Sequence, residues 1–147
     1  MFRAARCRSI AVVAAIAVGA AGCGEDERTN GEFVKEANAV CKRHYATISA
    51  AATKLLAGGK LPSPQQFGKL AQGTIIPQYN AQIGELRDVE PTESKKAAYD
   101  KWLADSEALA AKLKTNPMII QQPPMLASVN AQGDRLGLAV ECHIGAG

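Results

Sequence analysis

The chain has 147 residues, of which 47% are hydrophobic and seven are aromatic, and it contains four cysteines. This length allows one folded domain, and the apolar content excludes a fully disordered chain. The formal charge of +3 comes from Arg3, Arg6 and Arg8, which lie in a segment that we expect to be removed; the remaining 14 basic residues balance 14 acidic ones. A neutral mature chain offers no electrostatic basis for binding nucleic acid.

Residues 1–22 have the pattern of a secretory signal peptide. Three arginines precede an uncharged stretch over residues 10–21, and small residues lie at its end. The stretch is 12 residues long, whereas a membrane-spanning helix needs about 20. We therefore expect residues 1–22 to be cleaved after export rather than kept as a membrane-spanning anchor.

The residues at the expected cleavage site are Ala20, Ala21, Gly22 and Cys23. This run resembles the lipobox of bacterial lipoproteins, in which the cysteine receives a diacylglyceryl group before cleavage. The resemblance implies fatty acyl chains such as palmitate at Cys23 and a place on the outer face of the cell membrane. The family most often has Leu where Ala20 stands, and an ordinary signal peptidase also accepts small residues. A secreted protein with a free Cys23 is therefore the alternative.

After the cysteine, apolar residues recur at spacings of three and four in four stretches, each of which predicts an amphipathic helix. The polar residues 23–31 predict a short lipidated tether before a helical domain at residues 32–147. The four predicted helices cover residues 31–56, 63–88, 92–114 and 124–141.

The second stretch has a clear start signal and an interruption. Ser63 and Gln66 form a Ser-x-x-Gln capping pattern, with Pro64 at the first helical position. Pro77 lies inside the apolar pattern, where proline removes one backbone hydrogen bond and clashes with the preceding turn. We expect a kink or break around residues 73–77.

Four helices with short connections predict an all-α fold, an antiparallel four-helix bundle. Cys41 lies three turns into the first helix, and Cys142 lies at the end of the last. In such a bundle these two positions lie side by side, close enough for a disulfide. Since Cys23 is expected to carry lipid, Cys41 and Cys142 remain as a pair in an oxidising compartment, and we predict that they form a disulfide that clamps the bundle.

Several short runs are spread over most of the mature chain. They are Phe33-Val34, residues 37–41, residues 86–91, Trp102-Leu103, and residues 136–138 before Cys142. Together they resemble a loose group of small exported helical proteins from high-GC actinobacterial genomes. The resemblance supports the helical fold and the disulfide, and it implies no activity.

The cysteines and histidines also allow a different interpretation. Cys41-x-x-His44 and Cys142-His143 place two thiols and two imidazoles where a tetrahedral zinc ion could be held. Exported thiols oxidise, and adjacent residues diverge on a helix, so we favour the disulfide. His44 is then expected to be a partly exposed helix residue, and His143 a solvated cation near a helix C-terminus.

Five large apolar residues are candidates for a ligand or partner surface. Tyr99 and Trp102 could line a groove, although aromatic residues at helical spacing more often belong to a core. Met118, Ile119 and Ile120 lie in a connection bounded by prolines. They either plug one end of the bundle or present an exposed apolar patch, and the plug is favoured because exposing apolar surface is costly.

The sequence contains no motif of a known catalytic site, so we expect a non-catalytic component of the cell envelope. We expect it to need no cofactor and to bind an envelope protein or a small ligand near the membrane. One alternative is a metal-binding or enzymatic protein that uses His44 and His143. Another is a structural spacer of the envelope.

Overall fold

A computed structural model of the chain describes residues 28–59 and 61–145, and these residues form helices with no strand among them. The expected signal peptide and Cys23 lie outside the described residues. The elements are α1 (Asn30–Leu56), α2 (Pro64–Leu70), the π-helical turn η1 (Ala71–Ile75), α3 (Ile76–Leu86), α4 (Glu93–Thr115), the 3-10 helix η2 (Pro117–Gln121), α5 (Pro123–Leu136) and the 3-10 turn η3 (Val140–Cys142).

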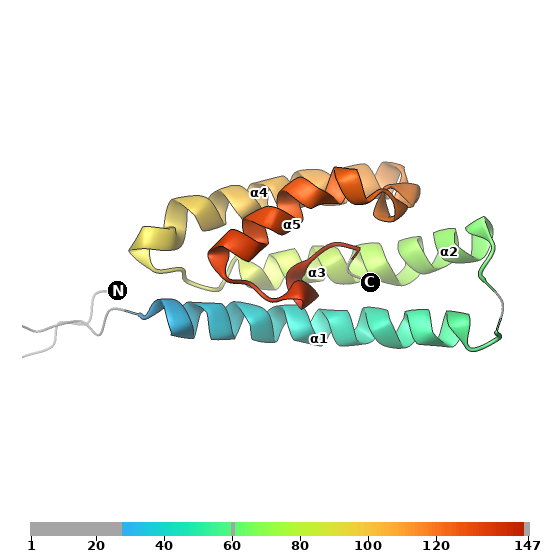
Figure 1. The fold of residues 1–147 in the computed structure, drawn as a ribbon, viewed down its shortest axis with the longest axis horizontal. Helices are drawn as coiled ribbons and strands as arrows, with labels where there is room; N and C mark the ends of the chain where they lie inside the picture. Colours follow the sequence, from blue (N-terminus) through green and yellow to red (C-terminus); the bar gives the residue numbers. More distant parts are fainter. Residues whose placement is uncertain (1–27, 60, 146–147) are drawn as a thin grey trace, which may run out of the picture.

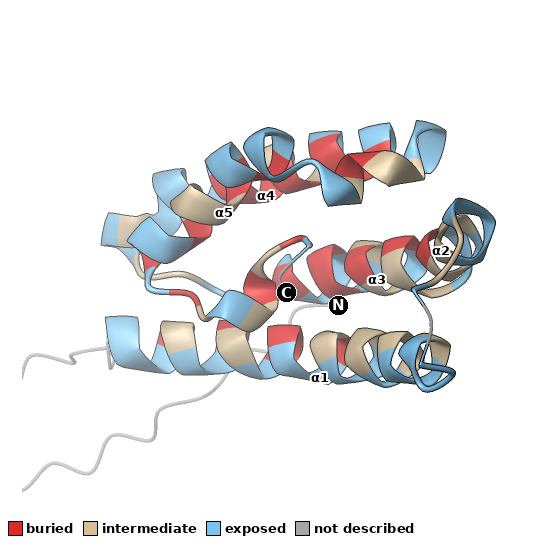
Figure 2. Cartoon of the chain, turned by 45° about the vertical axis from the view of Figure 1, so that its right-hand side comes forward, coloured by how far each residue is buried: buried red, intermediate tan, exposed pale blue. Residues whose placement is uncertain are grey.

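The helices lie in two layers that face each other (Figure 1). In one layer α1 lies beside the continuous segment of α2, η1 and α3, which runs in the opposite direction. In the other layer α4 lies beside α5, and α4 also packs against α3. The C-terminal turn η3 packs against α1. Figure 2 shows that the buried positions lie on the sides of the helices that face the other layer.

The helix starts follow from local capping. Ser63 and Gln66 form the predicted capping box, and Pro64 occupies the first position of α2. A second capping box, which the sequence analysis missed, joins Thr29 to Glu32. It starts α1 at Asn30, so the helical domain begins two residues before the predicted boundary at residue 32.

The predicted interruption near Pro77 is a π-helical turn. The backbone N–H of Ile76 bonds to the carbonyl oxygen of Ala71, five residues earlier. Because Pro77 has no N–H, the carbonyl of Gly73 would lose its usual partner in a regular α-helix. The wider turn at Ala71–Ile75 accommodates the proline, and α3 continues to Leu86.

The last predicted helix was too long at its C-terminal end. Gly137 has a φ of +88°, and the Leu138 N–H bonds to the Gly133 carbonyl oxygen at 3.0 Å, which is a left-handed helix cap. This cap ends α5 at Leu136 rather than near residue 141. Cys142 therefore lies in η3 and reaches α1 through a non-helical segment.

An aromatic cluster occupies the core between the layers. The Phe33 and Tyr99 rings meet edge to face with centroids 4.9 Å apart, and Trp102 stacks on Tyr99 at 5.7 Å. The Tyr99 hydroxyl donates a hydrogen bond of 2.7 Å to the Leu86 carbonyl oxygen at the end of α3. Tyr99 thus links α4 to the last turn of α3 by both packing and a buried hydrogen bond.

Replacing Tyr99 with Phe keeps the ring but removes the donor to the Leu86 carbonyl. We expect Tyr99→Phe to lower the free energy of unfolding by about 1–2 kcal/mol, because a buried hydrogen bond is lost and the Leu86 carbonyl keeps only the one from the Val89 N–H. Urea unfolding measures the change. Tyr45→Phe is the control, because the half-buried Tyr45 makes no hydrogen bond to a described residue through its hydroxyl; an equal loss in both variants would contradict the assignment.

Candidate functional site

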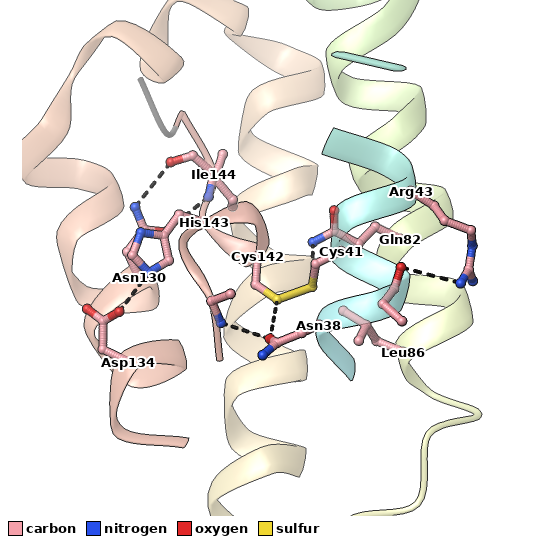
Figure 3. Close-up of a disulfide and its surroundings, with 12 residues drawn as sticks. Asn38, Cys41, Arg43, Gln82, Leu86, Asn130, Asp134, Cys142, His143 and Ile144 are labelled. Carbon is pink, nitrogen blue, oxygen red and sulfur yellow. Dashed lines mark hydrogen bonds and ion pairs between the residues drawn. A yellow bond between two sulfur atoms is a disulfide. The ribbon is translucent and has the colours of Figure 1, made fainter. Parts of the chain in front are cut away.

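The disulfide between Cys41 and Cys142 joins α1 to the C-terminal turn η3 (Figure 3). The two Cα atoms lie 4.9 Å apart, and the cysteines are 101 positions apart in the sequence. Cys41 is 0% exposed and Cys142 is 2% exposed. The predicted pairing is therefore confirmed, and the bond lies in the core.

Two amide side chains flank the disulfide. The Asn38 Oδ1 atom accepts a hydrogen bond of 2.8 Å from the Ala139 N–H and lies 3.6 Å from the Cys142 sulfur. The Gln82 Nε2 atom donates to the Cys41 sulfur at 3.6 Å. In Figure 3 the Gln82 Oε1 atom points away from the disulfide. Gln82 interrupts the apolar face of α3 between Tyr79 and Ile83, and this pattern is the signal that could have identified it.

An apolar pocket of about 200 Å³ lies next to Gln82. We use this name for the space that α1, α2, η1 and α3 enclose with residues from η2 and the C-terminus. Gln82 and Tyr79 belong to its α3 wall. The aliphatic and aromatic residues that line it include Ile48, Phe67, Leu70, Ile75, Ile120 and Ile144.

The residues after Cys142 form one wall of the apolar pocket and are held in two ways. The disulfide fixes Cys142, and Asn130 in α5 pairs with the backbone of Ile144 through two hydrogen bonds of 3.1 Å (Figure 3). Gly145 has a φ of +66°, and a β-carbon there would lie 2.7 Å from a Leu126 methyl group. The close approach at Gly145 thus requires glycine.

Two hydroxyl groups are buried behind the pocket wall. Neither the Tyr79 hydroxyl nor the Ser106 hydroxyl makes a hydrogen bond of good geometry with a described residue. Burial raises the pKa of Tyr79 well above its ordinary range, and the nearby Ser106 hydroxyl opposes part of this shift. Tyr79 therefore stays neutral.

His44 is buried, with 8% exposure, rather than partly exposed as predicted. Its Nδ1 atom lies 2.8 Å from the Gln78 Oε1 atom, and its Nε2 atom lies 3.0 Å from the Glu85 Oε1 atom. Arg43 also pairs with Glu85. The side-chain hydrogen bonds from Arg43 and then His44 lower the pKa of Glu85. This contact between α1 and α3 uses both ring nitrogens, so neither is free to bind a metal.

His143 is the C-cap of the 3-10 turn η3, so it lies near a helix C-terminus as predicted, but its side chain is not solvated. Its Nε2 atom lies 2.8 Å from Asp134 in α5, and its side chain is mostly buried. Within residues 28–59 and 61–145, no three His, Cys, Asp or Glu side chains converge as metal ligands. The structure thus does not bring His44 and His143 together with the cysteines, which bind each other.

Of the five residues predicted to form a ligand or partner surface, two lie in the core and three belong to a segment that covers one end of it. Tyr99 and Trp102 are 1% and 2% exposed, so both belong to the core, and Tyr99 also lies in the wall of a hollow between α4 and the connection from α3 to α4. Ile119 is buried in η2, and Met118 and Ile120 are half-buried beside it. The segment therefore covers one end of the core, and Ile120 also lines the apolar pocket.

Comparisons with known proteins identify no relative of the chain. No protein-family model, no curated protein and no solved structure matches the chain. None of the helices in the described part of the chain is both long enough and apolar enough to cross a membrane.

The disulfide makes a testable contribution to stability. We expect the double variant Cys41→Ala/Cys142→Ala to lose about 2–5 kcal/mol of unfolding free energy, because the bond closes a long loop in the unfolded chain. Denaturant unfolding with and without reductant measures the effect. Reductant should destabilise the wild type and leave the double variant unchanged; equal stability of the two oxidised proteins would contradict the prediction.

The contacts of Glu85 predict that the stability of the fold depends on pH. Its folded-state pKa lies below the usual value of 4.5, so the ionised carboxylate adds stability above that pH and the contribution is lost as the pH falls through the lowered pKa. We expect Glu85→Gln to reduce the decrease of Tm between about pH 5 and about pH 3. Glu90→Gln, at an exposed position, is the control and should leave the decrease unchanged.

Proposed function

We propose that this chain is an exported lipoprotein whose helical domain, an antiparallel four-helix bundle, binds a small ligand on the outer side of the cell membrane. The observation that carries the proposal is the buried disulfide between Cys41 and Cys142. Such bonds form and persist in oxidising compartments and are rare in the cytosol. A protein with this bond is expected to work outside the cytoplasm.

The leader supports attachment at Cys23. Three arginines, an uncharged stretch over residues 10–21 and small residues precede this cysteine. A diacylglyceryl group at Cys23 would supply two acyl chains, which hold a protein stably at a membrane, whereas one chain binds only marginally. The seven residue steps from Cys23 to Asn30 extend at most about 25 Å. The start of the helical domain would therefore lie close to the membrane face.

A binding role fits the apolar pocket better than a catalytic one. Its walls are mainly apolar, and its α3 wall offers the amide of Gln82, whereas the Tyr79 hydroxyl is buried behind that wall. His143, the imidazole at the pocket, is already paired with Asp134. The groups at the pocket thus suit holding a molecule, because an apolar wall with few polar groups is typical of ligand sites.

The intact mass of the protein extracted from bacterial membranes tests the proposal. We expect a mass that corresponds to loss of residues 1–22, addition of a diacylglyceryl group and loss of two hydrogens through the disulfide. Cys23→Ala should move the protein from the membrane fraction to the soluble fraction, since it removes the lipid attachment site. Cys7→Ala is the control and should change neither readout; an unmodified Cys23 in the wild type would contradict lipid anchoring.

A further inference from the structure

We propose that the apolar pocket binds a small, single-ring or short-chain apolar molecule that carries one hydroxyl group, and that the Gln82 carbonyl oxygen accepts the hydrogen bond from this hydroxyl. The inference rests on the proposed binding role and names the ligand class. It does not depend on the lipid at Cys23.

The size of the pocket sets the size of the ligand. The apolar pocket has a volume of about 200 Å³, and an apolar cavity of about 150 Å³ is large enough to hold benzene. Ile48, Phe67 and Leu70 in its wall are half-buried, so solvent still reaches the wall from α1 and α2. A molecule with one ring can therefore enter and displace water from apolar surface.

Gln82 makes the pocket selective for ligands that carry a hydrogen-bond donor. Its side chain is 2% exposed, and its one hydrogen bond to a described residue joins Nε2 to the Cys41 sulfur. The Oε1 atom points away from that bond and has no donor among the described residues (Figure 3). Unlike the Tyr79 and Ser106 hydroxyls, this oxygen is not fully shielded from solvent, so an apolar ligand in the pocket would remove its water and leave it without a partner. A ligand hydroxyl would satisfy it, whereas a hydrocarbon of the same shape would not.

The backbone of the same helical wall also shapes the pocket. Leu70 and Ile75 both line it, and between them lies the π-helical turn η1 (Ala71–Ile75). A π turn places one more residue in a helical turn than an α-helix does, and such turns recur at functional sites. The wide turn is thus a second feature that marks this space.

The remaining wall depends on the disulfide. Ile144 and Gly145 close the pocket, and Cys142 and Asn130 hold these residues in place. The same disulfide positions Gln82 through its contact with the Cys41 sulfur. We therefore expect the oxidised protein to bind the ligand and the reduced protein to bind it at least about 10-fold more weakly.

Phenol and toluene are the test pair, because they have the same ring and only phenol has a hydroxyl donor. Binding to the oxidised Cys23→Ala full chain is measured by NMR titration. We expect saturable binding of phenol, weakened about 10-fold by Gln82→Leu, with toluene binding unchanged or tighter in that variant. Gln82→Met keeps the side-chain length and should behave in the same way. Agreement between the two variants shows that the weaker binding does not come from a folding defect of Gln82→Leu.

A matched pair of substitutions on α1 locates the site. Ala52 lines the apolar pocket, whereas Ala50 is exposed and does not. Ala52→Leu fills the pocket and should abolish phenol binding, while Ala50→Leu should leave it unchanged.

Three results would overturn the proposal: no saturable phenol binding, equal weakening of phenol and toluene by both Gln82 variants, or equal effects of Ala50→Leu and Ala52→Leu. These outcomes leave the mass test of Cys23 unaffected. Likewise, an unlipidated Cys23 would overturn the anchor and leave phenol binding to the pocket unchanged.

Discussion

The disulfide between Cys41 and Cys142 is the constraint on which the rest of the structure depends. It fixes the end of the chain to the middle of α1, although α5 has already ended at Leu136. Without it, the segment after Gly137 would be held by the polar contacts of Asn38 and Asn130 and by the packing of Leu138 and Ile144 in the core. Because a covalent bond restricts the unfolded chain as well as the folded one, it also suits a small domain with few aromatic residues.

Three amide side chains position the segments around the disulfide. Asn38 orients the chain before η3, Asn130 orients the chain after it, and Gln82 contacts the sulfur from α3. Buried polar groups of this kind are stable only where each finds a partner, so they specify one arrangement of the segments around the bond. The carbonyl oxygen of Gln82 accepts no hydrogen bond from a described residue, and Gln82 lines the apolar pocket.

The helical elements could be predicted from local patterns in the sequence. The buried face of α4, including Tyr99 and Trp102, follows from apolar spacing, and the start of α2 follows from the Ser63 capping box. The burial of His44 could not be predicted, because its partners Gln78 and Glu85 come from a different helix. The predicted length of the last helix was wrong because the left-handed cap at Gly137 ends α5 before the apolar pattern stops.

The sequence by itself determined where helices begin, which faces are apolar and which two cysteines pair, because capping, periodicity and cysteine number are local or countable properties. It did not determine that Cys142 reaches α1 through a non-helical turn, or that Gln82, Ile120 and Ile144 meet around one pocket. Those residues lie far apart in the chain and come together only when the helices pack. The tertiary structure therefore decided the site, since a pocket is a property of the space between elements rather than of any one of them.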